Sequence, residues 1–210
     1  MPTGFELGVS TFGDVTVDAD ERPLSQAQAL RHVVAEGVLA DSVGLSFFGV
    51  GEHHRADFAV SAPEVVLAAI AGQTRQIRLG SAVTVLSSDD PVRVFQRFST
   101  LNAISNGRAE AIVGRGSFTE SFPLFGYSLD DYEVLFEEKL AIFAALRDAD
   151  RTGQPVQWKG TVRPPLDGIR VFPPVEHPPL TTWVGVGGSR ARQNRHDSCN
   201  DRHGSCRPQT

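Results

Sequence analysis

The chain has 210 residues, of which 40% are hydrophobic and 21% are charged, a composition typical of a soluble globular protein with a buried core. The formal net charge of −5 argues against a nucleic-acid-binding surface, and no apolar run reaches the ~18–20 residues that would span a bilayer. The N-terminus lacks the basic region and the long apolar core of a secretory signal, so we expect a cytoplasmic protein.

Short apolar segments alternate with segments of helical periodicity along most of the chain. Helix boundaries are marked by Pro63 and Asp90 at two expected starts and by Gly44 at an expected end. The segments that read as strands are 5–10, 45–51, 77–86, 108–114 and 181–188. The segments that read as helices are 24–44, 62–73, 90–105 and 130–148.

This alternation, with nearly continuous apolar strands, predicts an α/β fold with a parallel sheet. An open doubly wound sheet and a (β/α)8 TIM barrel both fit, but the Gly-x-Gly-x-x-Gly motif of dinucleotide folds is absent after the first strand. Polar and glycine-rich residues follow several strands, which favours the barrel. A barrel needs about 250 residues, so we expect an incomplete one with about five β/α units. The proline-rich segment 151–179 is expected to cross the barrel mouth and to contain a small hairpin.

The composition changes abruptly after Gly188, which divides the chain into a partial barrel domain (1–188) and a tail (189–210). The tail has no Val, Ile, Leu, Phe or Met and is expected to be disordered. Its Cys199 and Cys206, with two nearby histidines, match no metal-site spacing, so no metal site is predicted. The Arg-rich sequence of 189–210 favours an altered reading frame or a truncation over a natural basic tail.

The stretch "GEHH" places a carboxylate and two imidazoles at the end of an expected strand. Consecutive strand residues point to opposite sides, so only one of His53 and His54 is expected to face the barrel mouth. A pocket-facing histidine can act as a general base, and Glu52 could orient it or bind a polar ligand edge. The alternative is a pair of hydrogen-bonded imidazoles on the rim.

Two further strand ends carry small residues. Residues 80–82, "GSA", would let a flat ring approach closely, or would serve tight helix–sheet packing. Gly114 and Gly116 flank Arg115, whose forked guanidinium can clamp a phosphate. The alternative for that arginine is a turn with a solvated side chain.

In their order and spacing, "GEHH", "LGSAVTVLSSDDPVRVFQRFSTLNAISNGR" and "VGRGSFTESFPLFG" resemble the bacterial luciferase-like family of flavin-dependent monooxygenases. The resemblance runs from about Phe5 to Gly188 and is strongest between Gly49 and Gly126. It implies a (β/α)8 barrel that binds reduced FMN, or in some branches the deazaflavin F420, at the carboxyl ends of its strands. The family continues after "WVGVGG" with three further strands that this sequence lacks.

The resemblance also implies catalytic roles. His53 matches the histidine that assists the flavin–oxygen chemistry, and Glu52 matches an acidic residue beside the flavin. The implied reaction uses reduced flavin and dioxygen to oxidise a small organic substrate such as an aldehyde, inside a dry pocket. The alternatives are a truncated chain without turnover, a non-catalytic flavoprotein or partner subunit, and an F420-dependent oxidoreductase.

The cofactor-binding residues follow from the same resemblance. Ser81, Ala82 and Val83 are expected under the flavin ring, and the Ala82–Val83 bond falls where the family often has a non-prolyl cis peptide. Gly114 takes the place of a cysteine that the luciferases have near the ring. Arg115 matches an arginine that reaches toward the phosphate, although a chain without the late strands would keep only part of that clamp.

The partners that the resemblance implies are a second copy of the chain and a flavin reductase. Helices 62–73 and 91–104 match those through which the family commonly dimerises, so a homodimer is expected there. A reductase would supply the reduced flavin. No nucleic acid and no membrane partner is expected.

Overall fold

The structure is a computed structural model that describes residues 4–176 and 179–186. The tail predicted at 189–210, with Cys199 and Cys206, lies outside the described residues. None of the helices in the described ranges combines the length and the apolar composition that a bilayer-spanning helix requires.

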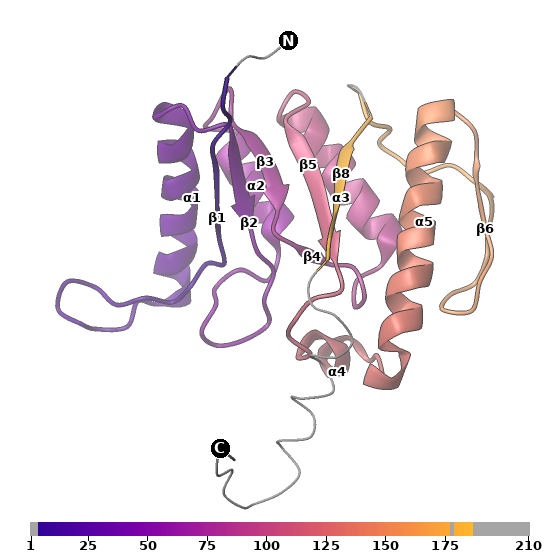
Figure 1. Ribbon diagram of the computed structural model, residues 1–210, viewed down its shortest axis with the longest axis horizontal. Coiled ribbons are helices and arrows are strands. Elements are labelled where there is room, and N and C mark those ends of the chain that lie inside the picture. The colour runs from indigo at the N-terminus through magenta and orange to yellow at the C-terminus, as the bar shows by residue number, and fades with distance from the viewer. Residues whose placement is uncertain (1–3, 177–178, 187–210) are drawn as a thin grey trace, which may run out of the picture.

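Six strands form one parallel sheet (Figure 1). Across the sheet the order of neighbouring strands is β1, β2, β3 and β5, and both β4 and β8 pair with β5. The strands are β1 (Gly8–Thr11), β2 (Phe47–Val50), β3 (Arg78–Ser81), β4 (Thr84–Val85), β5 (Ala109–Gly114) and β8 (Thr181–Gly185). β4 is a short continuation after β3, so the main strands lie side by side in chain order. All pairings in this sheet are parallel, so the carboxyl ends of the strands meet at one edge.

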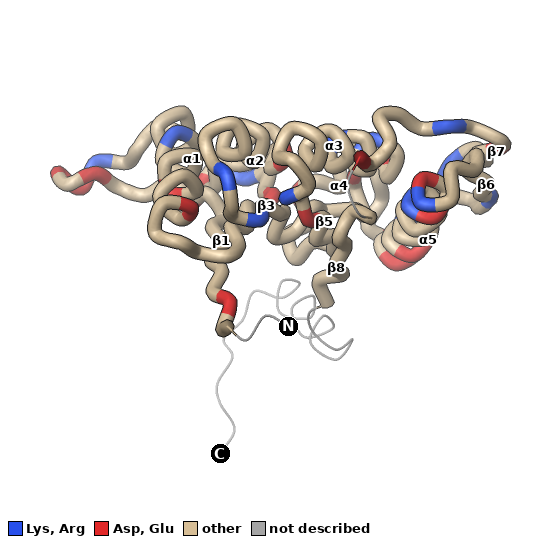
Figure 2. The backbone as a smooth tube through the Cα atoms, turned by 90° about the horizontal axis from the view of Figure 1, so that it is seen from above, with Lys and Arg blue, Asp and Glu red and all other residues tan. Residues whose placement is uncertain are grey.

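The helices lie on one side of this sheet, where Figure 2 shows α1, α2 and α3 as one layer beside the strands. The helices are α1 (Gln26–Ser42), α2 (Pro63–Ala71), α3 (Pro91–Ile104), α4 (Ser121–Phe125), α5 (Tyr132–Thr152) and the short 3-10 helix η1 (Leu129–Asp131). A doubly wound sheet has helices on both faces and a reversal of strand order. Sequential strands with helices on one face instead form part of a (β/α)8 barrel, as the sequence predicts.

The core lies between the helices and the sheet. Side chains alternate along the strands, so every second residue of β2, β3 and β5 points toward the helices. These buried strand residues are Phe48, Val50, Leu79, Ala109, Ala111 and Val113. From α3, Phe95 and Phe98 meet them and are almost completely buried. β5 shows this alternation, because Ala109, Ala111 and Val113 are buried while Glu110 and Ile112 are only partly buried.

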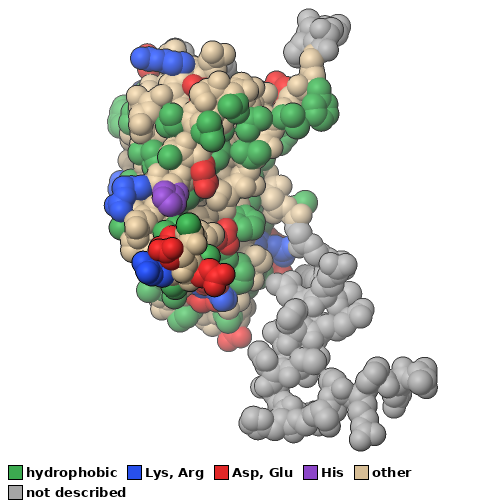
Figure 3. Space-filling view, turned by 90° about the vertical axis from the view of Figure 1, so that its left-hand side faces the viewer, with side chains coloured by type: hydrophobic (Ala, Val, Ile, Leu, Met, Phe, Trp, Pro, Cys, Tyr) green, Lys and Arg blue, Asp and Glu red, His purple; other side chains and the backbone are tan. Residues whose placement is uncertain are grey.

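The sheet is open at both edges within the described residues, because β1 pairs only with β2 and β8 only with β5. Trp183 and Val184 of β8 are exposed, as expected for the edge of a fifth unit. On the opposite edge, hydrophobic side chains gather over part of the face that carries α1 and β1 (Figure 3). The exposed large apolar residues of these two elements are Val9, Leu39 and, just before β1, Leu7.

The segment 151–179 contains the predicted hairpin but does not cross the mouth of the sheet. β6 (Val156–Trp158) and β7 (Leu166–Ile169) pair in antiparallel fashion and lie beyond α5 (Figure 1). Val156 and Leu166 are buried in the core cluster, and Glu138 of α5 accepts hydrogen bonds from the backbone N–H of Thr161 and Val162 at 2.8 and 3.0 Å. These contacts hold the hairpin on the helical layer, so the predicted position over the mouth is wrong.

Two charged side chains brace the amino ends of the strands. Asp41, near the end of α1, accepts hydrogen bonds from the backbone N–H of residues 75, 76 and 77 at 3.1, 3.0 and 2.7 Å. Arg108, just before β5, donates to backbone oxygens of Ala71, Thr74, Ile77 and Ser105. Burial alone would raise the pKa of Asp41, but its three amide donors hold that pKa below the usual value.

The replacement Asp41→Asn should lower the free energy of unfolding by about 1–2 kcal/mol at pH 7, because a neutral amide accepts more weakly from the three N–H groups. The folded pKa of Asp41 lies below its unfolded value, so this stabilisation is complete above the unfolded pKa and is lost as the pH falls through the folded one. Denaturant unfolding between pH 7 and pH 3 measures the difference between the two proteins, which should shrink toward acid pH.

Glu36→Gln on the exposed face of the same helix is the matched control, and it should change stability by less than about 0.5 kcal/mol. A wild-type advantage over Asp41→Asn that stays constant down to pH 3 would contradict the assignment.

Candidate active site

A pocket of about 170 Å³ opens at the carboxyl ends of the strands. Its wall includes Phe12 after β1, His53 after β2, Ala82 after β3 and Gly116 after β5. Ser121, at the start of α4, also lines it. The parallel sheet thus brings together residues that are more than 100 positions apart in the sequence. This edge of a barrel is where the loops that carry chemistry gather.

His53 lies in an aromatic enclosure inside this pocket. Its ring stacks on Phe58 with centroids 4.1 Å apart and meets Phe12 and Phe118 edge-on at 5.2 and 5.4 Å. Burial lowers the pKa of His53, while the carboxylates of Asp14 and Glu52 oppose that shift. Its Nδ1 is buried and has no hydrogen-bond partner among the described residues. The lowered pKa favours the neutral imidazole at pH 7, and its Nδ1 is an enclosed polar atom without a hydrogen-bond partner among the described residues.

Glu52 binds the second imidazole rather than the first. Its Oε1 lies 2.9 Å from His54 Nε2, and its Oε2 accepts a hydrogen bond from Val85 N at 2.9 Å. Both histidines line the pocket, so the expectation that only one would face the mouth is wrong. The physical reason is that β2 ends at Val50, so strand alternation does not extend to residues 51–54.

The chain breaks its strand between β3 and β4, where the Ala82–Val83 peptide bond is cis. Ala82 and Val83 both line the pocket. Ser81 is buried behind them, where its hydroxyl donates to Ile112 O at 2.8 Å and accepts from Ile112 N at 3.2 Å. Ser81 therefore ties β3 to β5 rather than contributing to the pocket wall.

Gly114 and Arg115 lie beside the pocket and do not line it. A Cβ at Gly114 would stand 2.8 Å from Val83 Cγ2, so a larger residue there would press on the pocket wall from behind. The Arg115 guanidinium forms an ion pair with Glu133 of α5 at 3.0 Å. Gly116, the next residue, lines the pocket and has a φ of +79°. Arg115 is thus next to the pocket, but another side chain of the protein occupies its guanidinium.

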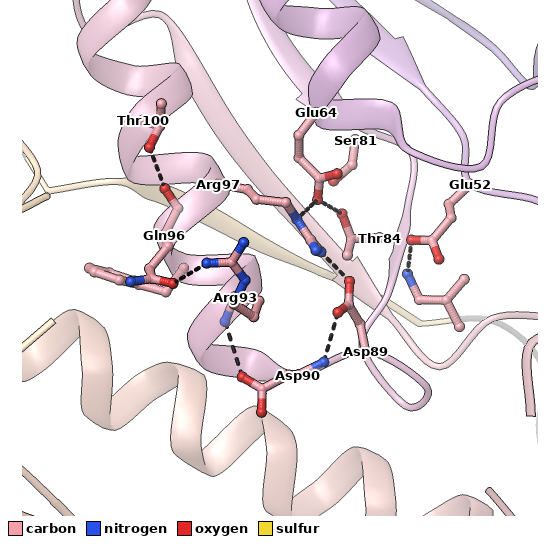
Figure 4. A network of polar contacts seen from close by, with 12 residues as sticks. Glu52, Glu64, Ser81, Thr84, Asp89, Asp90, Arg93, Gln96, Arg97 and Thr100 are labelled. Atoms are coloured by element: carbon pink, nitrogen blue, oxygen red, sulfur yellow. Dashed lines mark hydrogen bonds and ion pairs between the residues drawn. The ribbon is translucent and has the colours of Figure 1, made fainter. Parts of the chain in front are cut away.

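A buried polar network supports the pocket from the helix side (Figure 4). Glu64 of α2 lies 3.4 Å from Arg97 Nε of α3 and 3.5 Å from Thr84 Oγ1 of β4. Arg97 also pairs with Asp89 in the loop before α3. Burial raises the pKa of Glu64, and the Arg97 guanidinium opposes that rise. The network fixes β4, and with it Val85, the donor to Glu52.

The sequence analysis did not predict the aromatic enclosure of His53 or the ion pairs of Arg55 beside it. Arg55 pairs with Asp57 at 2.9 Å and with Glu120 at 3.0 Å, and its guanidinium carbon lies 4.9 Å from the centre of the Phe118 ring. The loop after β2 is thereby joined to the loop after β5. Phe12 after the first expected strand, Phe58 after "EHH" and Phe118 in "GSFTESF" were the available signal, because aromatic residues are uncommon in simple turns.

Comparisons with known proteins show the family of the chain. The family model described as "Luciferase-like monooxygenase" matches residues 5–194. An N-acetyl-S-alkylcysteine monooxygenase of Bacillus subtilis (strain 168) is 39% identical over 117 residues, which cover 54% of this chain and 35% of that protein. The chain spans between a third and about half of the length of the relatives it matches.

Solved structures share the fold. The monooxygenase RslO1 from Streptomyces bottropensis superposes with a TM-score of 0.73 at 23% identity, over 86% of this chain and 53% of that one. The oxygenating constituent of 3,6-diketocamphane monooxygenase from Pseudomonas putida, in complex with FMN, gives 0.70 at 20% identity over 85% and 51%. An F420-dependent secondary alcohol dehydrogenase gives 0.65 at 20% identity over 85% and 51%.

The half-buried imidazole of His53 predicts a pH dependence of stability. Since the folded pKa of His53 is lowered and the unfolded one stays near 6.5, the unfolded chain binds the extra proton first as the pH falls. Stability contributed by neutral His53 is thus present above about pH 6.5 and is lost as the pH falls toward the folded pKa. His53→Phe, which keeps a ring against Phe58, should remove this part of the acid destabilisation. Denaturant midpoints between pH 8 and pH 5 test it, and identical pH profiles for both proteins would contradict it.

Proposed function

The chain belongs to the luciferase-like monooxygenase family, and from that premise we propose that it is a flavin-dependent monooxygenase. In the proposed reaction, reduced FMN and dioxygen oxidise a small, aldehyde-like organic substrate. The observation that carries this proposal is the half-buried His53, whose Nδ1 has no hydrogen-bond partner among the described residues, in an aromatic pocket that Ala82 and Val83 also line. A flavin reductase would supply the reduced cofactor.

The residues of the pocket fit a flat, mostly apolar ring that carries a polar edge. Ala82 and Val83 offer a flat backbone surface with small side chains, and His53 Nδ1 offers one hydrogen-bonding atom. The volume of about 170 Å³ is below the roughly 300–1,000 Å³ of typical small-molecule sites. The described part of the chain would therefore enclose only part of the ligand. Arg115, beside Gly116, is where the phosphate would be held.

When bound, the reduced flavin supplies the electrons that activate dioxygen. The protein's part is to position the reactants, exclude water and move a proton. Phe12, Phe58 and Phe118 shield the space around His53 from solvent. His53 is neutral at pH 7 and can accept or donate a proton at Nδ1 during the reaction. Glu52 is the positioning residue that joins the imidazole loop to β4.

A flavin-binding protein without turnover is the second candidate. It is favoured by the volume of about 170 Å³, because the pocket of the described residues encloses only part of a ligand. An F420-dependent oxidoreductase is a third, because that chemistry also occurs on this fold. Titration with reduced FMN, oxidised FMN and F420, followed by oxygen uptake with an aldehyde, separates the three.

His53→Ala should lower the coupled oxidation of a straight-chain aldehyde by about 10²-fold or more, because a positioned proton-transfer group is lost. Flavin binding should persist, and more of the oxygen consumed should leave as hydrogen peroxide. The measurements are aldehyde oxidation and peroxide yield with enzymatically reduced FMN. His32→Ala, on the exposed side of α1, is the matched control and should behave as wild type. Unchanged coupled turnover in His53→Ala would remove His53 from the mechanism.

We also propose a homodimer through α2 and α3. The outer face of these helices exposes Val65, Ala69, Ala103 and Ile104, whereas Val66 is buried against the core. Small and apolar side chains allow close packing of helices. Val65→Asp should shift the protein toward monomer by placing a charge in that contact, as measured by sedimentation at micromolar concentration. The same change at exposed Leu39 of α1 should not, and a wild-type protein that is only monomeric would overturn the proposal.

A further inference from the structure

Arg115 precedes Gly116 of the pocket wall, and the carboxylate of Glu133 already pairs with its guanidinium. We propose that Glu133 is a specificity-determining residue that competes with anionic ligands for Arg115. On this inference, Glu133 sets how strongly the site prefers a phosphate-bearing ligand over its neutral counterpart. The identity of that ligand as FMN rests on the proposed function, whereas the competition itself does not.

The competing pair is formed by two adjoining elements at the carboxyl edge of the sheet. Arg115 directly follows β5, and Glu133 lies in the first turn of α5. Both carboxylate oxygens contact the same Arg115 nitrogen, Nη1, at 3.0 and 3.1 Å. A guanidinium has five N–H donors in a planar fork, so this contact uses one corner of the fork. It is not the two-armed arrangement that makes arginine–carboxylate pairs strongest.

Arg115 is the more enclosed member of the pair and Glu133 is the more exposed one. The Arg115 guanidinium carbon lies 6.0 Å from the ring centres of both Tyr132 and Phe136. Tyr132 in turn donates from its hydroxyl to Gly116 O at 2.7 Å, which holds the backbone beside Arg115. The side chain of Glu133 is 45% exposed, against 29% for Arg115. Glu133 can therefore turn into solvent when another anion takes its place.

This arrangement has a consequence for ligand choice. With Glu133 in place, the pair is electrically neutral, so a dianionic phosphate must displace the carboxylate or bind beside its negative charge. Either route makes the binding free energy of the phosphate less favourable than it would be at an unpaired guanidinium. A ligand without a phosphate is not affected by this competition. Glu133 thus narrows the difference in affinity between FMN and riboflavin, and also weakens the binding of a free phosphate.

The test compares Glu133→Gln with Glu137→Gln, an equal change of charge one helical turn further along α5 at an exposed position. The first measurement uses inorganic phosphate and the full chain, and records the rise in melting temperature with phosphate at constant ionic strength. Glu133→Gln should bind phosphate roughly fivefold more tightly than wild type, the size expected for removing a partly exposed ion-pair partner. Glu137→Gln should match wild type.

The second measurement uses flavin fluorescence to compare FMN with riboflavin. Glu133→Gln should raise the ratio of FMN to riboflavin affinity by a similar factor, and adding Arg115→Ala should abolish the effect of Glu133→Gln. Equal phosphate responses in wild type and Glu133→Gln would overturn the inference. If neither flavin binds, the proposed function fails, while the phosphate measurement still decides the role of Glu133.

Discussion

The site depends on the carboxylate of Glu52. This side chain links the segment after β2 to β4, beyond the last backbone hydrogen bond between β2 and β3. The ladder between β2 and β3 ends with Ala82 N donating to Val50 O at 2.7 Å. The chain then turns away to β4, which pairs with β5 and no longer with β2. From there Glu52 holds both Val85 N and His54. A single buried carboxylate thereby fixes the pocket wall on one side and the imidazole loop on the other.

Much of the fold can be predicted from the sequence, because burial of one sheet face imposes a pattern that is easy to recognise. Each predicted helix of the barrel units coincides with an observed one within a few residues, and Asp90 caps α3 as expected by accepting from Val92 N at 2.8 Å. The segment 77–86 was predicted as one strand and is observed as β3 and β4, because neither Gly nor Pro at residues 82–85 marks the break, whereas the cis peptide that the family resemblance placed at Ala82–Val83 is confirmed. α4 escaped prediction because a five-residue helix ending at a glycine in the left-handed region reads as a turn. The hairpin at 151–179 was expected, but its position depends on contacts with α5 that no local pattern encodes.

The site itself was less predictable, since its contacts join residues far apart in the chain. The motif "GEHH" marked the right strand end, but the pairing of Glu52 with His54 depends on where β2 stops. The bond from Val85 to Glu52 spans 33 positions. Arg115 was expected to face a phosphate, and its pairing with Glu133 follows only from the way α5 returns to the edge of the sheet. Local sequence therefore identified the residue types, while the topology decided which of them meet.

A comparison of two arginine–glutamate pairs at this edge shows how burial separates a structural role from a proposed binding role. Glu64, with 6% of its side chain exposed, pairs with Arg97 beneath the pocket. Removal of the Arg97 guanidinium would leave the buried Glu64 carboxylate without its charge partner, in a medium that solvates a charge poorly. The pair of Arg115 and Glu133 is open to water, where an ion pair contributes only about 0–1 kcal/mol. An arginine–glutamate pair thus supports the structure where water is largely excluded, as at Glu64. It is exchangeable where water reaches both side chains, as at Glu133.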